Sequence, residues 1–270
     1  MGWRNTLTVM SVNYTIENRA AVVLLDRADV LNAFDEDLGM ATLDAVRRAA
    51  ADEAVRCIVI TGAGRAFSSG EDLGALADGY NRGEVPELGQ TLVRRYNPLI
   101  RAIRTAPKPV VAAINGVAAG AGASVALACD FRIASEHAKL VLAFIKVGLV
   151  PDSGALWFLT KMVGVSKAWE LAATGEPVSA EHALALGLFH RVVAADRFEE
   201  EWRAFAGELA AGPTRAFALT KSLLESATAV PLDDQLELEV KAQTEAGLTH
   251  DHLEGVQAFL EKRRPTFEGS

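Results

Sequence analysis

The sequence predicts an α/β fold with parallel strands, followed by a helical region at the C-terminal end. In residues 1–195, short apolar runs that are typical of buried strands alternate with segments of helical periodicity. Such alternation favours parallel strands joined by crossover helices. In residues 196–270 the pattern is almost wholly helical. We therefore expect a core of residues 1–195 and a C-terminal helical region of residues 196–270.

The expected strands are β-branched or fully apolar runs bounded by turn residues. The first two are expected to pair as a hairpin or meander. The runs are 8–17, 21–26, 56–61, 109–114, 131–134, 140–143 and 189–193.

Helices are expected between these strands, where apolar residues recur at helical spacing. The first covers 35–51, and Asp35 or Asn32 is placed to cap it. Another covers 88–105, and the polar, glycine-containing stretch 75–89 before it indicates a loop. The C-terminal helices carry apolar residues that are expected to pack either within the subunit or between subunits: Leu223, Leu236, Leu238, Val240, Leu248 and Phe259.

Composition limits the kinds of partner. The formal net charge is −8, which disfavours nucleic acid and anionic membranes but not an anionic ligand held by local amides. No apolar stretch approaches the ~18 residues of a membrane span, and no signal peptide is recognised, so a cytoplasmic location is expected. Cys57 and Cys129 lie in apolar runs, which indicates buried, reduced thiols rather than a disulfide or a metal site.

Two glycine-rich loops, 67–73 and 115–124, each follow a predicted strand and precede a helix. Such a junction presents unpaired amide donors, and glycine lets a ligand approach the backbone closely. Two of them facing one point would supply two N–H groups to a developing oxyanion. Neither completes a dinucleotide-binding G-x-G-x-x-G, because Phe67 and Val125 occupy the place of the third glycine.

Asp152 stands out because it lies in an apolar stretch, VGLVPDSGALW, with no basic residue close in sequence. An acid in such surroundings is either a helix cap or a base with a perturbed pKa. Asp152 or Ser153 is placed to cap a helix at 154–163, and the sequence alone leaves both alternatives open. The five histidines show no metal-binding spacing, so no metal site is expected.

Four segments resemble the enoyl-CoA hydratase/isomerase (crotonase) superfamily. They are DRADVLNAF (26–34), GAGRAFSSGEDL (62–73), PKPVVAAINGVAAGAGASVALACDFRIAS (107–135) and FLEKRRPTF (259–267). Within that superfamily, AFIKVGLVPDSGALWFL (143–159) is most similar to the ring-epoxide isomerases of phenylacetyl-CoA degradation. The resemblance implies a spiral of ββα units with a C-terminal helical region, assembled as a homotrimer or a dimer of trimers. It also implies an acyl-CoA substrate and no cofactor, since coenzyme A is part of the substrate.

The resemblance also implies site residues. By position, the two backbone donors of the family's oxyanion hole correspond to Glu71 and Ala121. Phe144 and Trp157 are expected to wall the acyl pocket, with Phe131 or Phe158 nearby, although Trp157 and Phe158 also fit a buried helix. The tail residues Phe259 and Lys262 match positions that approach the nucleotide end of CoA. The remaining expected substrate-binding residues are Arg27, Val30, Leu31, Phe67, Ser69, Asp72, Leu73 and Gly120.

The departures from the family pattern bear on the reaction. The two glutamates that hold water in hydratases correspond to Ser124 and Phe144, neither of which can act as a general acid or base. Asp152 matches the acid of dienoyl-CoA isomerases, of the phenylacetyl-pathway isomerases and of aryl-CoA dehalogenases. We therefore expect an isomerase with Asp152 as its single carboxylate base. The alternatives are an enoyl-CoA hydratase, a dehalogenase or hydrolase, and a non-catalytic CoA-binding member. In any of them the Glu71 carboxylate must point away from the thioester oxygen.

Overall fold

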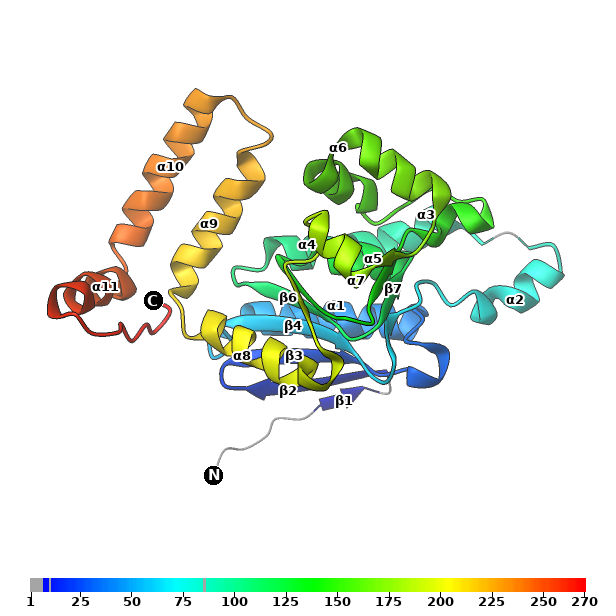
Figure 1. The fold of residues 1–270 in the computed structure, drawn as a ribbon, viewed down its shortest axis with the longest axis horizontal. Coiled ribbons are helices and arrows are strands. Elements are labelled where there is room, and N and C mark those ends of the chain that lie inside the picture. Colours follow the sequence, from blue (N-terminus) through cyan, green and yellow to red (C-terminus); the bar gives the residue numbers. More distant parts are fainter. Residues whose placement is uncertain (1–6, 10, 85) are drawn as a thin grey trace.

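In the computed structural model, which describes residues 7–9, 11–84 and 86–270, a seven-stranded sheet forms the centre of the molecule (Figure 1). The order is β1-β2-β3-β4-β6-β8-β11, antiparallel from β1 to β3 and parallel from β3 onward. The parallel pairing predicted from the alternating pattern is confirmed. The strands are β1 Leu7–Val9, β2 Val12–Glu17, β3 Ala20–Leu25, β4 Cys57–Gly62, β6 Val110–Ile114, β8 Phe131–Ser135 and β11 Arg191–Val193.

A second, four-stranded sheet has the order β10-β9-β7-β5. Its strands are β5 Ala66–Ser68, β7 Val117–Ala119, β9 Lys139–Val141 and β10 Val178–Ser179. Strands β5, β7 and β10 were not predicted, because segments of two or three residues are too short to show a periodic pattern. Their consequence for the site is direct. Because β5 pairs in parallel with β7, the two glycine-rich loops leave the sheet side by side.

Most predicted helices are present, and one predicted loop is wrong. The side chain of Asp35 accepts the Leu38 N–H at 2.8 Å and caps α1, as predicted. The expected loop 75–89 contains most of a helix, α2. The expected helix 88–105 is divided into α3, a π-helical turn and α4. The elements are η1 Ala28–Val30, α1 Glu36–Ala51, α2 Leu73–Asn81, α3 Leu88–Thr91, the π turn Leu92–Tyr96, α4 Asn97–Thr105, α5 Ala121–Ala128, η3 Ala143–Val147, α6 Ala155–Thr174 and α7 Ala180–Ala185.

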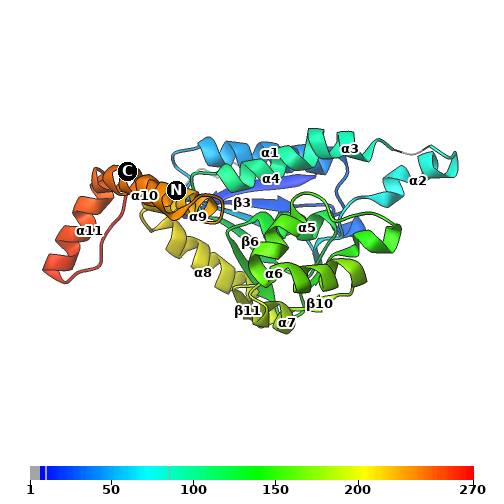
Figure 2. The same ribbon diagram turned by 90° about the horizontal axis from the view of Figure 1, so that it is seen from above.

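Helices cover both faces of the large sheet (Figure 2). Alternate residues of the strands point to opposite faces, so Val23 packs in the cluster beneath α1 and α4, while Val22 packs in a separate cluster. Trp202 of α8, Phe198–Ala210, covers that second cluster. Burial of both faces explains why these strands are continuous apolar runs rather than alternating ones.

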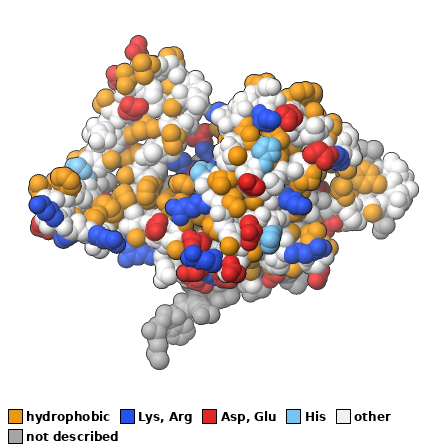
Figure 3. Space-filling model, viewed as in Figure 1, with side chains coloured by type: hydrophobic (Ala, Val, Ile, Leu, Met, Phe, Trp, Pro, Cys, Tyr) orange, Lys and Arg blue, Asp and Glu red, His pale blue; other side chains and the backbone are white. Residues whose placement is uncertain are grey.

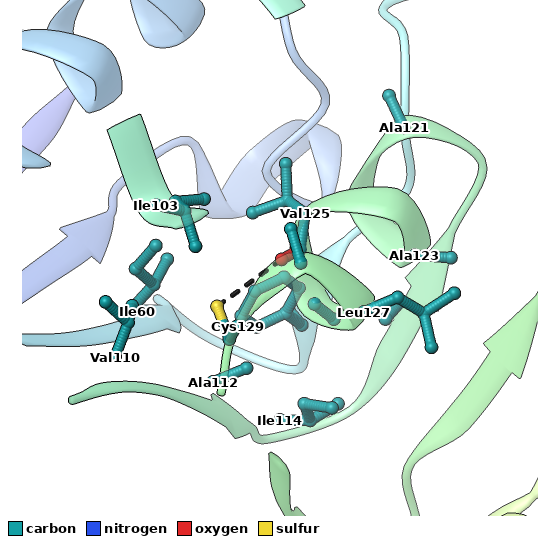
Figure 4. Close-up of a cluster of buried hydrophobic side chains, with 14 of the residues drawn as sticks. Ile60, Ile103, Val110, Ala112, Ile114, Ala121, Ala123, Val125, Leu127 and Cys129 are labelled. Carbon is teal, nitrogen blue, oxygen red and sulfur yellow. Dashed lines mark hydrogen bonds between the residues drawn. The ribbon is translucent and has the colours of Figure 1, made fainter. Parts of the chain in front are cut away.

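Both cysteines are buried and free, as predicted. Figure 4 shows Cys129 at the end of α5 among the side chains of Ile103 and Val110, with its Sγ donating to the Val125 oxygen at 3.4 Å. Cys57 lies in the cluster on the other face of the sheet. Burial raises the pKa of each thiol to about 12, so both thiols are held in the protonated, unreactive form at neutral pH.

Three helices at the C-terminal end, α9 Thr214–Ser226, α10 Leu232–Gly247 and α11 His250–Glu261, project away from the core (Figure 1). Figure 3 shows many hydrophobic side chains on their surface. Helix α8 also lies in the expected helical region, but it packs on the sheet. No helix within residues 7–9, 11–84 and 86–270 combines the length and apolar character that crossing a bilayer requires. The exposed apolar side chains of the projecting helices include Leu224, Leu232, Leu236, Leu238, Val240, Leu248, Leu253, Val256, Phe259 and Leu260.

Candidate active site

A pocket opens where the two glycine-rich loops meet the helices that follow β5 and the turn that precedes α6. Most of its lining is apolar, and its described carboxylates are Glu71 and Asp152. The predicted site residues that the structure brings together here are Ser69, Glu71, Leu73, Gly120, Ala121, Phe144 and Asp152. The other lining residues are Gly70, Leu76, Tyr80, Leu88, Thr91, Leu92, Tyr96, Ala143, Val147 and Leu149.

The two loops are in close backbone contact at Gly70. A Cβ on this glycine would lie 2.9 Å from the Ala119 oxygen and 3.4 Å from the Ala121 nitrogen, and its φ is +96°. Both the space and the backbone conformation therefore require glycine. The contact places Glu71 and Ala121, the residues that follow the two close-packed glycines, at the same end of the pocket.

The backbone N–H groups of Glu71 and Ala121 are both free of the regular hydrogen bonds around them. Phe34 and Glu71 form a parallel bridge, but its bonds run from the Phe34 N–H to the Gly70 oxygen, at 2.7 Å, and from the Asp72 N–H to the Phe34 oxygen, at 2.9 Å. Ala121 is the first residue of α5, where an N–H has no intrahelical acceptor.

Asp152 lies in the turn between η3 and α6. The backbone of the turn is left-handed at two residues, with a φ of +79° at Gly154, which glycine adopts freely, and of +52° at Ser153, which is unusual for a residue with a side chain. Helix α6 begins at Ala155, and Gly154 occupies its N-cap without any side-chain hydrogen bond. Of the two alternatives that the sequence leaves open for Asp152, the helix cap is therefore excluded, and Asp152 is a residue of the pocket lining.

Three hydrogen bonds hold Asp152 in place. Its backbone oxygen accepts from the Ala155 N–H at 2.9 Å and from the Ser124 hydroxyl at 3.1 Å. Its Oδ1 accepts from the Ser153 hydroxyl at 2.8 Å. Burial raises the pKa of the Asp152 carboxyl, and the nearby charge of Glu71 raises it further, against opposing effects of the Ser153 hydroxyl and Arg95. A carboxylate in this state binds a proton more readily than an exposed one does.

The Glu71 carboxylate is held by two residues that were not among the predicted site residues. The Arg95 Nη2 donates to Oε1 at 2.6 Å and to Oε2 at 2.5 Å, and the Tyr96 hydroxyl donates to Oε2. Both donors come from the π turn, far in sequence from Glu71. The one sequence signal for them was Gly39, a glycine inside the predicted helix 35–51, which marks a place of close approach.

The segment expected to bind CoA is a compact unit beside the pocket. The guanidinium of Arg27 pairs with Asp35 at 3.2 Å and with Asp72 at 3.0 Å. The Ser69 N–H donates to the Leu31 oxygen at 2.9 Å, and its hydroxyl to the Val30 oxygen at 3.3 Å. Val30 is exposed. Of the expected binding residues around this unit, Phe67 is fully buried in the core.

Other predicted site residues lie elsewhere. Trp157 is half exposed on α6, with the Lys161 Nζ 3.6 Å from its ring centroid, and is not part of the described pocket lining. Phe158 is a core residue. Phe131 contacts His190 and Phe205 beside the second cluster. The two predicted residues of the tail lie at the projecting α11. Phe259 is exposed on this helix, and Lys262 follows its last residue as the C-cap, with a φ of +55°.

The two residues that the resemblance matches to the hydratase glutamates, Ser124 and Phe144, carry side chains that cannot transfer protons in catalysis. Ser124 is fully buried on α5, where its hydroxyl contacts the Gly120 oxygen at 3.3 Å and the Asp152 oxygen. Phe144 lines the pocket from η3. Asp152 is thus the pocket carboxylate that is not bound by a cationic side chain.

A model of the family described as enoyl-CoA hydratase/isomerase matches residues 15–270. A "probable enoyl-CoA hydratase" of Rhodobacter capsulatus is 44% identical over 260 residues, covering 96% of this chain and 98% of that protein. The 1,2-epoxyphenylacetyl-CoA isomerase of Escherichia coli K12 is 40% identical over 254 residues, covering 94% of this chain and 97% of that protein.

Solved structures agree. The crystal structure of an enoyl-CoA hydratase from Polaromonas sp. JS666 matches with a TM-score of 0.88 at 36% identity, covering 95% of this chain and 99% of that chain. The predicted crotonase fold is thereby confirmed. A relative named as a hydratase and one named as an isomerase both align over nearly the whole length of this chain. The chain belongs to the enoyl-CoA hydratase/isomerase family.

Proposed function

We propose that the protein is an acyl-CoA isomerase that moves a double bond, or rearranges a ring epoxide, in an enoyl-CoA or arylacetyl-CoA. The observation that supports this most strongly is the state of the two pocket carboxylates. Asp152 is held through its backbone with a raised pKa, whereas Glu71 is bound by Arg95 and Tyr96. One carboxylate is sufficient for an isomerisation, because the same proton is removed and returned.

For a 3-enoyl-CoA the proposed steps balance without any co-reactant. The Asp152 carboxylate removes a proton from C2, and the electron pair moves onto the thioester oxygen to give a dienolate. The N–H groups of Glu71 and Ala121 donate hydrogen bonds to that oxygen, and one such donor typically lowers the barrier by about 3 kcal/mol. The Asp152 carboxylic acid then returns the proton to C4, which gives the 2-enoyl-CoA.

The apolar lining supports the choice of Asp152 as base and an apolar acyl group as substrate. Leu76, Tyr80 and Leu88 line the pocket from α2 and α3, and Phe144 and Leu149 also belong to the lining. A pocket of this kind excludes water and so keeps a carboxylate basic. The relative named as a 1,2-epoxyphenylacetyl-CoA isomerase supports an aromatic acyl group, and with it a role in phenylacetate degradation.

Hydration of an enoyl-CoA is the second candidate, because two carboxylates line one pocket and a 44% identical relative is named as a probable hydratase. Addition of water needs one group to activate the water and another to protonate carbon. For Glu71 to act in this way, its carboxylate would have to give up hydrogen bonds from Arg95 and Tyr96. This requirement favours isomerisation.

The unit formed by Arg27, Val30, Leu31 and the loop Ser69–Leu73 is proposed to bind CoA. Phe259 and Lys262 are proposed to approach the nucleotide of a CoA bound by a neighbouring subunit, in a homotrimer or dimer of trimers. This assignment is supported by the position of Phe259 on α11 and of Lys262 at its C-cap, because α11 projects from the core of its own subunit.

The test is an assay with 3-hexenoyl-CoA, 2-hexenoyl-CoA and ring-epoxidised phenylacetyl-CoA, comparing the wild type with Asp152→Asn. Exposed Asp44 on α1 offers a matched control, Asp44→Asn. Isomerised product that disappears in Asp152→Asn alone supports the proposal. Rapid hydration of 2-hexenoyl-CoA by the wild type would replace it with the hydratase assignment. Binding of acyl-CoA without turnover of any substrate would favour a non-catalytic member, and hydrolysis or displacement products another reaction of the family.

A further inference from the structure

The pocket holds an ion pair that the proposed reaction does not use. Glu71 supplies a backbone N–H to the proposed oxyanion site, yet its own side chain is an anion attached to the same residue. That anion is paired with Arg95, whose side chain is only 3% exposed, while Glu71 is 26% exposed. A charged guanidinium is seldom buried without a partner, so the pair forms one unit at the edge of the pocket.

The structure makes specific room for Arg95. A Cβ on Gly39, inside α1, would lie 2.2 Å from the Cδ of Arg95 and 2.5 Å from its Cγ. The arginine stem thus occupies a slot that exists because position 39 carries no side chain. Glycine inside a helix is destabilising relative to alanine. The chain therefore retains a destabilising residue at the place where Arg95 passes α1.

The π turn brings both partners of Glu71 from neighbouring positions in sequence. Arg95 and Tyr96 close the turn Leu92–Tyr96, and each donates to the Glu71 carboxylate. The guanidinium carbon of Arg95 also lies 4.6 Å from the centroid of the Tyr96 ring. π turns inside helices occur frequently at functional sites, and this one fixes the side chain of a residue whose backbone lines the pocket.

The net charge of the pocket depends on this ion pair. With Arg95 present, the charges of Glu71 and Arg95 cancel, and the pocket carries the single charge of Asp152. As the proton moves to Asp152, this charge passes to the substrate oxygen and the total stays at one. Without Arg95, the developing enolate would face the unpaired carboxylate of Glu71 in a low-dielectric pocket, where like charges repel strongly.

We propose that Arg95 is a positioning residue for the reaction. It neutralises the Glu71 carboxylate and holds it against Tyr96, so that negative charge can develop on the thioester oxygen that the Glu71 N–H binds. This inference rests on the proposed enolate chemistry. Arg95 itself does not contact the substrate. Removing Arg95 slows the reaction only while Glu71 carries its charge.

The same contacts determine how the rate depends on pH through Asp152. The groups that act on the pKa of Asp152 are the Ser153 hydroxyl on its own turn, Glu71 from the loop after β5, and Arg95 from the π turn. Tyr96 also lies nearby, but burial raises its pKa and keeps its hydroxyl uncharged. Glu71 raises the pKa of Asp152 and Arg95 lowers it. Removing Arg95 therefore shifts the acid limb of the rate profile to higher pH, and removing the Glu71 charge as well returns it.

The experiment measures exchange of the α-protons of butyryl-CoA for deuterium in D₂O, by NMR, because this exchange reports enolate formation without requiring the correct isomerisation substrate. The variants are Arg95→Met, Arg95→Lys, Glu71→Gln and the double variant Arg95→Met with Glu71→Gln. Arg94→Met is the matched control, since Arg94 is an exposed neighbour paired with Glu36 at 3.0 Å. Thermal unfolding and butyryl-CoA affinity are measured for every variant.

The expected result is a loss of exchange rate of roughly 100-fold in Arg95→Met, as for a lost oxyanion contact, with an acid limb at higher pH. Arg95→Lys keeps most of the rate, and the double variant recovers at least about 10-fold over Arg95→Met with its acid limb restored. A wild-type rate in Arg95→Met, or no recovery in the double variant, overturns the inference. Absence of exchange in the wild type overturns the proposed enolate chemistry itself, and the inference with it.

Discussion

The hydroxyl of Ser124 donates a hydrogen bond to the backbone oxygen of Asp152, with 3.1 Å between the two oxygens. This bond ties the turn that carries the proposed base to α5, whose first residue carries one proposed oxyanion donor. Ser124 is fully buried. The resemblance matches this position to a glutamate of the hydratases. Here it holds a serine that cannot transfer protons and instead supports the turn that carries Asp152.

Ser124→Ala is expected to lower kcat by roughly 10-fold, because a small displacement of a positioned base is costly in rate. The free energy of unfolding should fall by about 1 kcal/mol, which is typical for loss of one buried hydrogen bond. Steady-state kinetics and urea unfolding measure the two effects. Ser222→Ala, at an exposed site on α9, is the control. An unchanged kcat in Ser124→Ala would show that Asp152 does not depend on this bond.

The rate should depend on pH through Asp152. The reaction requires the carboxylate form, and burial raises the pKa of Asp152 above its ordinary value of 3.8, with Glu71 adding to the effect. The rate is therefore expected to fall as the pH drops, at a higher pH than an exposed aspartate would give. Glu71→Gln removes one raising cause and should move this limb to lower pH. The measurement is kcat/KM against pH for both proteins, and a limb at the same pH in both would contradict the coupling.

Asp152→Asn should be inactive and yet more stable than the wild type at neutral pH. The folded-state pKa of Asp152 is raised, so its contribution to stability is full below the unfolded pKa and is lost as the pH rises through the folded pKa. An asparagine avoids the charge and still accepts the Ser153 hydrogen bond. Thermal unfolding at neutral and at acidic pH tests this, and the advantage of the variant should vanish in acid. Equal stability at neutral pH would mean that burial does not penalise the charge.

The central strands could be predicted because their burial on both faces demands continuous apolar runs, as in Cys57–Gly62 and Val110–Ile114. The short strands of the second sheet could not, because two or three residues carry no period. The site residues likewise include one that the sequence reveals and a pair that it does not. Asp152 was visible as an acid in an apolar stretch, whereas the pairing of Glu71 with Arg95 joins residues whose neighbours in sequence give no sign of it.

The projecting helices should mediate self-association. Leu248 and Phe259 are 83% and 81% exposed, and many large apolar side chains exposed on the same three helices indicate an interface. We expect a trimer or hexamer by sedimentation velocity, and a shift toward monomer in Leu248→Lys. Ala54→Lys adds the same charge at an exposed turn of the core and should leave the assembly intact. A wild type that sediments as a monomer at all concentrations would refute the interface.

Two glycine-to-alanine variants should change stability in opposite directions. In a helix interior, alanine is favoured over glycine by about 1 kcal/mol, and at Gly207 on α8 a Cβ meets nothing within 4 Å. Gly207→Ala should therefore stabilise the protein by up to that amount. At Gly39 the new Cβ meets the stem of Arg95 at 2.2 Å, and overpacking of this kind costs about 1–3 kcal/mol.

Gly39→Ala should also lower the rate, because relief of the clash displaces the guanidinium from Glu71. Urea unfolding and the α-proton exchange rate, measured on both variants, separate the two effects. A Gly39→Ala protein that is stabilised like Gly207→Ala and exchanges at the wild-type rate would show that Arg95 can leave its slot without consequence. A protein that is destabilised and slow, with an acid limb at higher pH, would show that α1 positions the charge that keeps Glu71 neutralised.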